Sequence, residues 1–321
     1  MCYSAQVIQM ARKLDRQLGL RLDYDEAEKL FMRRLEEPGI VISRGFEANF
    51  VDPSTDQQRR IWGAIEEHRS RQATTLEKNL FSQKTRLVNA ERTLREKETL
   101  KAREDVRIAT SKIAALTDKL HDLHRVDPAA QDNRIFPLVY AGVIVRQSGE
   151  NVLTPMRYFC RPAGKPAFYD KKFPGLYNAR RDNLEKFWGS QFGSHHALMV
   201  AESFYENVSL HIKEHRALEP GEKERNLVLQ FTPQPPQAML IACLYSHWTG
   251  TDAPEVRGFA AITDEPPPDV AAAGHDRCIT NLKPEHIETW LTPAGRSREE
   301  LQTILSDRAV STYQHAVLQA A

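Results

Sequence analysis

The second residue of the chain, Cys2, could supply two nucleophiles from one small framework. The sequence begins Met1-Cys2-Tyr3-Ser4, and a side chain as small as Cys at position two permits removal of the initiator Met. The new N-terminus would carry an α-amine and a thiol with ordinary pKa values of about 8 and about 8.5. Such a 1,2-aminothiol captures an aldehyde as a Schiff base and closes it to a thiazolidine ring. The alternative is that Cys2 is part of a frayed terminus.

Three short polar stretches further along could complete a site of this kind. They are Asn178-Ala179-Arg180, Phe204-Tyr205-Glu206 at the end of an apolar strand, and His275-Asp276-Arg277 before a helix start. A carboxylate at a strand rim and an imidazole that titrates near neutral pH are common general acid–base groups. Each stretch also has an ordinary structural explanation as a turn, a solvated carboxylate or a structural imidazole. No Ser-His-Asp arrangement, Gly-rich phosphate loop or metal cluster competes with them, so we expect no cofactor and no metal.

Composition limits the partners and the compartment. The 321 residues are 41% hydrophobic and 27% charged with a formal net charge of +1, so nucleic acid would have to bind a local patch. The four cysteines are scattered without CxxC spacing, which argues against a zinc site or a disulfide framework. No apolar run is long enough to cross a bilayer, and the N-terminus lacks a hydrophobic signal-peptide core. We therefore expect a cytoplasmic protein with no membrane partner, associated with the nucleoid when it is on DNA.

Hydrophobic periodicity predicts an α+β fold. Helical spacing indicates a helix over Ser4–Leu18, with Ser4 as N-cap, and a second over Asp23–Glu36, whereas Ile40–Val51 suggests a short strand or extended segment. After Asp127-Pro128 the pattern changes to strands and turns. Strands are expected at 136–145, 152–159, 196–206, 226–231, 239–248 and 258–263, and short helices at 182–192, 284–291 and 298–306. This is the pattern of a mixed, mostly antiparallel domain.

Residues 53–127 differ from the rest and predict an inserted helical arm, which divides the remaining domain into residues 1–52 and 128–321. From Thr55 to Val126 there is no Pro and a single Gly. A coiled-coil-like seam with 3-4 spacing runs along the second half, and a more broken one along the first. The first seam consists of Ala73, Leu76, Leu80, Leu87, Ala90 and Leu94, and the second of Val106, Ala109, Ile113, Leu116, Leu120 and Leu123. A hairpin that turns near Arg95–Asp105 accounts for both.

The charge of the arm leaves its role open. From Thr55 to Val126 there are 16 Lys and Arg against 11 Asp and Glu, a local excess of +5. A solvated helix face with i,i+4 pairs explains such a run. The alternatives are an arm that follows the phosphates of a nucleic acid and an arm that mediates self-association.

Taken in order behind the Met-Cys start, these motifs resemble the SRAP family (SOS-response-associated peptidases, the abasic-site-crosslinking proteins). The resemblance covers the N-terminus and about residues 134–293. Its matching elements are Asn178-Ala179-Arg180, Phe204-Tyr205-Glu206, the strand ends 245–248 and 262–265, His275-Asp276-Arg277, and Lys283-Pro284-Glu285 followed by Trp290-Leu291. The helical insertion is foreign to the compact form of the family.

The resemblance implies a substrate and roles for individual residues. Members of the family bind single-stranded DNA and trap the open-chain aldehyde of an abasic deoxyribose, which would make this chain part of the DNA damage response. Cys2 would form the thiazolidine, Glu206 would position the amine and relay protons, and His275 would act as acid or base. Asn178 would orient the terminus or the sugar by hydrogen bonds.

The resemblance also implies which residues contact the DNA. Arg180 would bind a phosphate that flanks the lesion, because a guanidinium makes paired charge-assisted bonds to phosphate. Arg277 and Arg157 are further phosphate candidates, and Trp248 could stack on a base.

Two other functions stay open from the sequence. A Cys-dependent peptidase or autopeptidase would use Cys2, Glu206 and His275 on a protein substrate, independently of DNA. An interaction protein would use the arm for assembly and the remaining domain only to dock on DNA, so that Cys2→Ser would leave its function intact.

Overall fold

The computed structural model describes residues 4–214, 216–251 and 253–318, with the side chains of residues 15–17 excepted. Cys2 lies outside the described residues. The helices are α1 Ala11–Leu18, α2 Tyr24–Glu36, α3 Arg44–Glu47, α4 Asp56–Glu96, α5 Leu100–His124, α6 Tyr169–Lys172, α7 Leu210–Lys213, α8 Pro268–Ala272, α9 Ile287–Leu291 and α10 Arg298–Ser306, with 3-10 turns at Ala48–Phe50, Ala130–Asn133, Arg181–Asn183 and Pro284–His286. The strands are β1 Ser4–Val7, β2 Leu20–Leu22, β3 Arg134–Ile135, β4 Tyr140–Gln147, β5 Glu150–Tyr158, β6 Asn178–Arg180, β7 His196–Ser209, β8 Asn226–Gln234, β9 Met239–Trp248, β10 Val256–Asp264, β11 Cys278–Ile279 and β12 Thr312–Leu318.

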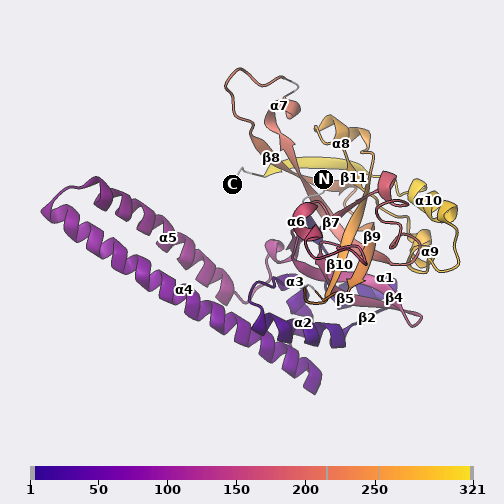
Figure 1. Cartoon of the computed structure of the whole chain (residues 1–321), viewed down its shortest axis with the longest axis horizontal. Helices are drawn as coiled ribbons and strands as arrows, with labels where there is room; N and C mark the ends of the chain where they lie inside the picture. Colours follow the sequence, from indigo (N-terminus) through magenta and orange to yellow (C-terminus); the bar gives the residue numbers. More distant parts are fainter. Residues whose placement is uncertain (1–3, 215, 252, 319–321) are drawn as a thin grey trace. The chain divides into compact units, whose positions relative to one another are not determined.

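Contacts between residues divide the chain into two compact units. The first holds Met1–Leu30, Pro38–Val51 and Ala130–Ala321, and the second holds Phe31–Glu37 with Asp52–Ala129. The first unit contains the sheet and the short helices, and the second contains α4 and α5 (Figure 1). The predicted functional division into a catalytic domain and an inserted arm stays a prediction.

Five strands of the first unit form a closed ring. β4 pairs with β5, β5 with β10, β10 with β9, β9 with β7, and β7 returns to β4. Most pairs among the described strands are antiparallel, and the parallel ones are β2–β5, β5–β10 and β6–β10. Ring closure removes the free edges that an open sheet would expose, as in a β-barrel. The predicted mixed, mostly antiparallel α+β class is therefore confirmed.

Aromatic pairs across neighbouring strands pack the core of this unit. The rings of Phe204 in β7 and Phe231 in β8 are opposite one another and stack with centroids 5.0 Å apart. Tyr158 of β5 and Phe259 of β10 are likewise register partners, with centroids 5.1 Å apart. Such pairs add stability beyond the apolar area that they bury. They hold in place the strands that carry the candidate site.

The helix predicted over Ser4–Leu18 is wrong in its first part. Ser4–Val7 form β1, which lies between β3 and β7, and only Ala11–Leu18 are helical. All four residues of β1 are buried, including the polar Ser4 and Gln6, and neighbouring strands pair with both edges of β1. Pairing with strands more than 120 residues away overrides the local periodicity, and Ser4 is a strand residue rather than an N-cap.

Two other local predictions need correction. Ile40–Val51 is extended only at its start, where Ile42 makes one bridge to Tyr140, and it then forms α3 and a 3-10 turn. The α-helix predicted over 182–192 is absent, and a 3-10 turn and further turns replace it. The physical reason is that the Asp182 carboxylate accepts hydrogen bonds from Arg180 and does not cap a helix.

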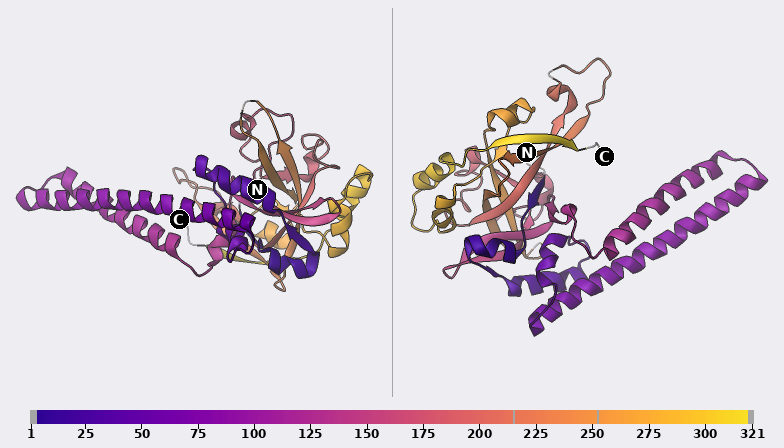
Figure 2. Two further views of the ribbon diagram at one scale, coloured as in Figure 1. Left: turned by 90° about the horizontal axis from the view of Figure 1, so that it is seen from below. Right: turned by 180° about the vertical axis from the view of Figure 1, so that it is seen from behind.

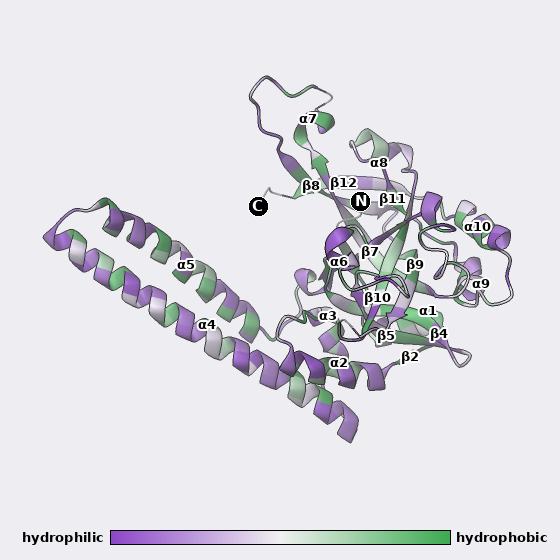
Figure 3. Ribbon diagram, in the orientation of Figure 1, coloured by the Kyte–Doolittle hydropathy of each residue, from purple (hydrophilic) through white to green (hydrophobic). Residues whose placement is uncertain are grey.

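The helical unit is a hairpin, as the seam predicts. α4 and α5 run side by side in opposite directions in every view (Figures 1 and 2), and hydrophobic positions recur along both helices (Figure 3). Ala90, Ala102 and Ala109 are buried between the helices, and the Arg86 guanidinium pairs with Asp105 across them. The partner of the seam is thus α4 of the same chain. Self-association through the arm stays a prediction.

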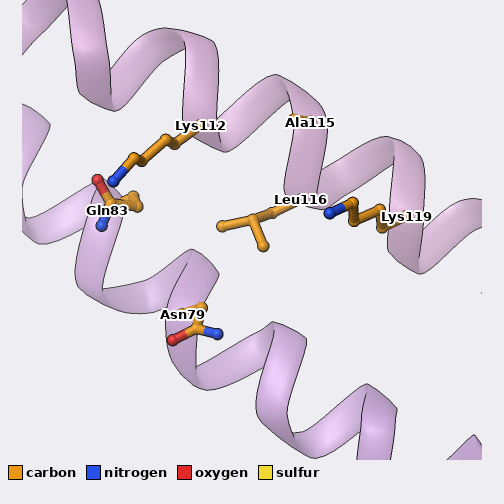
Figure 4. Close-up of a pocket in the computed structure, with 6 residues that line it drawn as sticks. All are labelled: Asn79, Gln83, Lys112, Ala115, Leu116 and Lys119. Atoms are coloured by element: carbon orange, nitrogen blue, oxygen red, sulfur yellow. The ribbon is translucent and has the colours of Figure 1, made fainter. Parts of the chain in front are cut away.

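A groove between α4 and α5 interrupts the seam of the hairpin. It has a volume of about 300 Å³ and is lined by Asn79 and Gln83 of α4 and by Lys112, Ala115, Leu116 and Lys119 of α5 (Figure 4). The buried side-chain oxygen of Gln83 makes no hydrogen bond to any residue that the structure describes. A polar residue in a coiled-coil seam fixes the register of the helices at a cost in stability.

In the part of the chain that the structure describes, no helix combines the length and apolar character needed to cross a membrane.

Candidate functional site

Glu206 lies in β7, the longest strand that the structure describes. Its side chain is 0% exposed, although the sequence places it at a strand end where a carboxylate is usually solvated. On one side β7 pairs with β8, and on the other Tyr205 is the register partner of Ser4 in β1. The register between β1 and β7 shifts next to Gln6, which indicates a bulge. The pairing places the start of β1 directly beside the residue that precedes Glu206.

His275 enters the site from the turn after α8. Gly274 ends this helix with φ of +94°, a conformation that residues with a Cβ rarely adopt. The next residue, His275, is 8% exposed, and its Nε2 lies 3.2 Å from Oε2 of Glu206. The structure therefore brings together two of the predicted catalytic residues, which are 69 positions apart in the sequence.

The hydrogen bonds of His275 determine where the protons of this pair reside. Nδ1 lies 2.9 Å from the carbonyl oxygen of Arg277 and 3.3 Å from the amide nitrogen of the same residue. The carbonyl is the closer of the two and can only accept, which favours the tautomer with a proton on Nδ1. Nε2 and the Glu206 carboxylate then need one further proton between them to make a favourable contact. The pair is either imidazolium with carboxylate or neutral imidazole with carboxylic acid. It can give up one proton and take it back.

Burial sets the electrostatics of the surrounding groups. Burial lowers the pKa of His275 below its ordinary value, because the charged imidazolium loses solvation. Burial also raises the pKa of the Cys278 thiol to about 12, and the nearby Glu206 carboxylate acts in the same direction. Cys278 is therefore a neutral thiol beside Glu206 at neutral pH. The sequence does not distinguish this cysteine from the buried Cys160 and Cys243.

Asn178 is a buried amide with open hydrogen-bonding capacity. It begins β6, opposite Ala261 of β10, and is 6% exposed. Neither Nδ2 nor Oδ1 has a hydrogen-bond partner among the described residues. A buried amide without hydrogen-bond partners destabilises the fold. A ligand that supplies these partners would therefore bind favourably at Asn178.

Arg180 lies on the surface two residues further along β6. Its Nε donates to Oδ1 of Asp182 at 2.9 Å, and Nη2 donates to Oδ2 at 2.5 Å. Both side chains are about half exposed, so the pair contributes little free energy and can be exchanged for another anion. Arg277 lies 3.6 Å from the Asp276 carboxylate. To bind DNA, Arg180 and Arg277 would each have to release the neighbouring carboxylate and contact a phosphate instead.

Arg157 and Trp248 belong to a different cluster. Trp248 is opposite Val256 at the beginning of β10, whereas β11, which follows the His275 turn, pairs with the other end of β10. The Trp248 ring is 3% exposed, and the Arg161 guanidinium lies over it at 4.2 Å. A base could stack on Trp248 only after displacement of Arg161.

The carboxylate of Asp170 holds this second cluster together. It lies 2.9 Å from Nη2 of Arg157 and accepts two hydrogen bonds from Arg161. Burial alone would raise the pKa of Asp170, but these two guanidinium groups hold it below its ordinary value. In this structure Arg157 is therefore part of a buried ion-pair cluster.

No group of three or more His, Cys, Asp or Glu side chains in the described ranges is arranged to hold a metal ion.

Most of the chain is similar to known proteins. A family model described as SOS response associated peptidase (SRAP) matches residues 70–320. No curated protein matches the sequence. Three solved structures are similar. The first, a protein from Bordetella bronchiseptica, is 15% identical over 59% of this chain and 88% of that chain, with a TM-score of 0.45. A phage-related protein from the same organism is 19% identical over 62% and 86%, with a TM-score of 0.45. A protein from Bacteroides thetaiotaomicron is 15% identical over 58% and 78%, with a TM-score of 0.44.

Proposed function

The chain belongs to the SOS response associated peptidase (SRAP) family, which associates it with the response to DNA damage, and from this premise we propose that it traps abasic sites in single-stranded DNA through Cys2. The observation that carries the proposal is the buried Glu206–His275 pair, which lies next to Tyr205, the register partner of Ser4. Two residues of extended chain reach at most about 7 Å, so Cys2 is tethered within that distance of Ser4. The start of β1 and the Glu206–His275 pair lie in one neighbourhood, which supports the assignment of Cys2 to the same site.

The chemistry needs an aldehyde, an amine, a thiol and one mobile proton. The amine of Cys2 adds to the open-chain C1′ aldehyde of the abasic sugar, and the carbinolamine oxygen leaves as water to give an imine. The thiol sulfur then adds to the imine carbon, and its proton ends on the ring nitrogen. One water is released in total. The Glu206–His275 pair takes a proton from the attacking amine and returns it to the departing oxygen.

The other polar groups position the substrate in this proposal. Asn178 supplies donors and an acceptor to the sugar or to the amine, which would satisfy its open amide. Arg180 exchanges Asp182 for a phosphate of the strand, and Arg277 binds a second one. Arg157 and Trp248 contribute only if their cluster opens.

The test is incubation of the purified protein with single-stranded DNA that contains one abasic site. We expect a shifted band that resists denaturation, absent with intact DNA and absent for Cys2→Ala. An equal yield from Cys2→Ala would contradict the proposal. The description of the family favours a second candidate, a Cys-dependent peptidase. It predicts cleavage of a protein substrate without DNA, which the same preparation can be assayed for.

A further inference from the structure

Arg134 is an arginine near the candidate site that no sequence motif singles out. It lies in β3 as the register partner of Gln6 in β1. Its Nε donates a hydrogen bond to Oγ of Ser4 at 3.2 Å. The guanidinium carbon lies 3.8 Å from the centre of the Tyr205 ring and 4.9 Å from that of Phe136. Two aromatic rings and one hydroxyl therefore fix the position of this cation.

The positive charge of Arg134 has no carboxylate opposite it among the described residues. The other arginines near the proposed site differ in this respect. Arg180 pairs with Asp182, Arg181 with Asp264, and Arg277 lies near Asp276. Arg134 is instead held by π faces and by a hydroxyl, which orient a guanidinium without neutralising it. A half-buried, pre-oriented cation of this kind favours an anionic ligand.

The geometry of the guanidinium group indicates which class of anion Arg134 would bind. Ser4 occupies Nε, and no residue that the structure describes forms a hydrogen bond or ion pair with the Nη groups, so these can serve a ligand. Two Nη groups match the oxygens of one phosphate, and stacking on an aromatic ring is typical of arginines that bind phosphates in nucleic acids. Lys would lose both the stacking and the paired donors.

The position of Arg134 indicates which phosphate of the DNA strand it would bind. Arg134 contacts Ser4, and Cys2 is within about 7 Å of Ser4 by covalent reach. A phosphodiester is attached directly to the sugar that Cys2 would trap. We infer that Arg134 binds the phosphodiester that flanks the abasic sugar, as a positioning residue for the DNA strand. The inference rests on the proposed function, because the abasic DNA strand that Arg134 would bind is the substrate of the proposed reaction.

The first experiment measures affinity without any covalent step. Single-stranded DNA with a tetrahydrofuran residue has the phosphates of an abasic site but no aldehyde. We expect Arg134→Gln to bind it about tenfold more weakly, since the variant loses a charge-assisted contact to phosphate. The slope of log affinity against log salt should shrink by about 0.7 for the lost contact. Arg134→Lys should fall between, and the exposed Arg296→Gln, which removes the same charge elsewhere, should match the wild type.

The second experiment separates a DNA contact from support of the N-terminus. Glycolaldehyde is a small aldehyde without a phosphate, so its adduct reports on the aminothiol alone. We expect Arg134→Gln to keep the wild-type adduct rate within about twofold while crosslinking to abasic DNA slows about tenfold at low DNA concentration. Thermal unfolding of each variant checks that the fold is retained.

Two results would overturn the inference. One is unchanged affinity of Arg134→Gln for tetrahydrofuran DNA, and the other is an equal loss of glycolaldehyde and DNA capture, which would indicate a purely structural role. Failure of the proposed function would look different, because the wild type itself would then form no crosslink. The affinity measurement would still test the phosphate contact.

Discussion

Nε2 of His275 lies 3.2 Å from Oε2 of Glu206, while Nδ1 of the same ring lies 2.9 Å from the carbonyl oxygen of Arg277. Two almost fully buried side chains are therefore close enough to exchange a proton. Burial disfavours charge on both partners, so the position of this proton responds to any amine or hydroxyl that enters the site.

Removal of either partner should slow the capture of abasic DNA without unfolding the protein. We expect Glu206→Gln and His275→Ala to lower the crosslinking rate by about 10²-fold, the lower end for general acid–base catalysis. Rates are measured by gel shift under single-turnover conditions. Gln302→Ala, at a residue outside the pair, serves as control. A variant with an unchanged rate would show that its residue has been assigned wrongly.

The same pair should leave a signature in the pH profile. Because burial lowers the pKa of His275, its neutral form persists as pH falls through about 6.5, the ordinary value. We expect the ratio of wild-type to His275→Ala rates to stay constant down to that pH and to fall only below it. The ratio removes the contribution of the Cys2 amine, which both proteins share. A ratio that already falls between pH 8 and 7 would contradict this expectation.

His196 should make the fold sensitive to acid. Its Nδ1 faces the carbonyl of Trp290 at 2.9 Å, its Nε2 accepts from the Gly193 amide at 3.0 Å, and the ring stacks on Trp290. Burial lowers the pKa of His196 to about 3. Between about pH 6.5 and that value, the unfolded chain therefore binds a proton at His196 that the native protein does not bind. Stability from this group is complete above about pH 6.5 and is lost at about 1.4 kcal/mol per pH unit as pH falls towards 3.

Denaturant unfolding at several pH values tests this contribution. We expect His196→Gln to be less stable at pH 7 but to lose less stability than the wild type between pH 6.5 and 4. The exposed His315→Gln should follow the wild-type dependence. Parallel pH dependences for the wild type and His196→Gln would rule out His196 as the source.

Asp182 should restrain DNA binding by Arg180. Both side chains are about half exposed, and such pairs are worth about 0.2–1 kcal/mol. We expect Asp182→Asn to bind single-stranded DNA up to about fivefold more tightly by fluorescence anisotropy. Glu185→Gln removes the same charge nearby, at a residue that contacts Gln302 instead of Arg180, and should have a smaller effect. Equal gains from both variants would indicate a general charge effect.

The arm should be dispensable for capture. Ala109 is fully buried between α4 and α5, and an Asp there would place an unpaired charge in the seam at a cost on the order of 3 kcal/mol. We expect Ala109→Asp to lose helical circular dichroism, whereas the exposed neighbour Thr110→Asp should not. Both variants should crosslink abasic DNA within about twofold of the wild-type rate. Loss of capture by a folded Ala109→Asp protein would show that the arm helps to build the active site.

The sequence predicts those elements whose signals are local. β9 and α10 begin and end at the predicted residues, because turn residues flank the strand and Ser297 and Glu300 form a capping box for the helix. The arm turns within the predicted stretch, although it has no Gly there. Instead Lys97 leaves the helix with extended dihedral angles, and Thr99 caps α5 through the amide of Ala102.

The remaining features depend on contacts distant in sequence. Ser4–Val7 becomes a strand because β3 and β7 take up its backbone hydrogen bonds. The distance between Glu206 and His275 follows from the register of the sheet and from the turn at Gly274, neither of which periodicity reveals. The burial of Trp248 under Arg161 is equally invisible in the sequence, because an aromatic residue at a strand end is compatible with either a core or a binding face.

The central claim is a covalent bond at Cys2, and mass spectrometry of the crosslinked protein tests it most directly. The intact mass of the free protein first shows whether Met1 has been removed. After reaction with an abasic oligonucleotide and digestion, the account predicts that the N-terminal peptide beginning at Cys2 carries the sugar remnant with the loss of one water. An adduct on any other residue, or a mature protein that retains Met1 and still crosslinks, would contradict it.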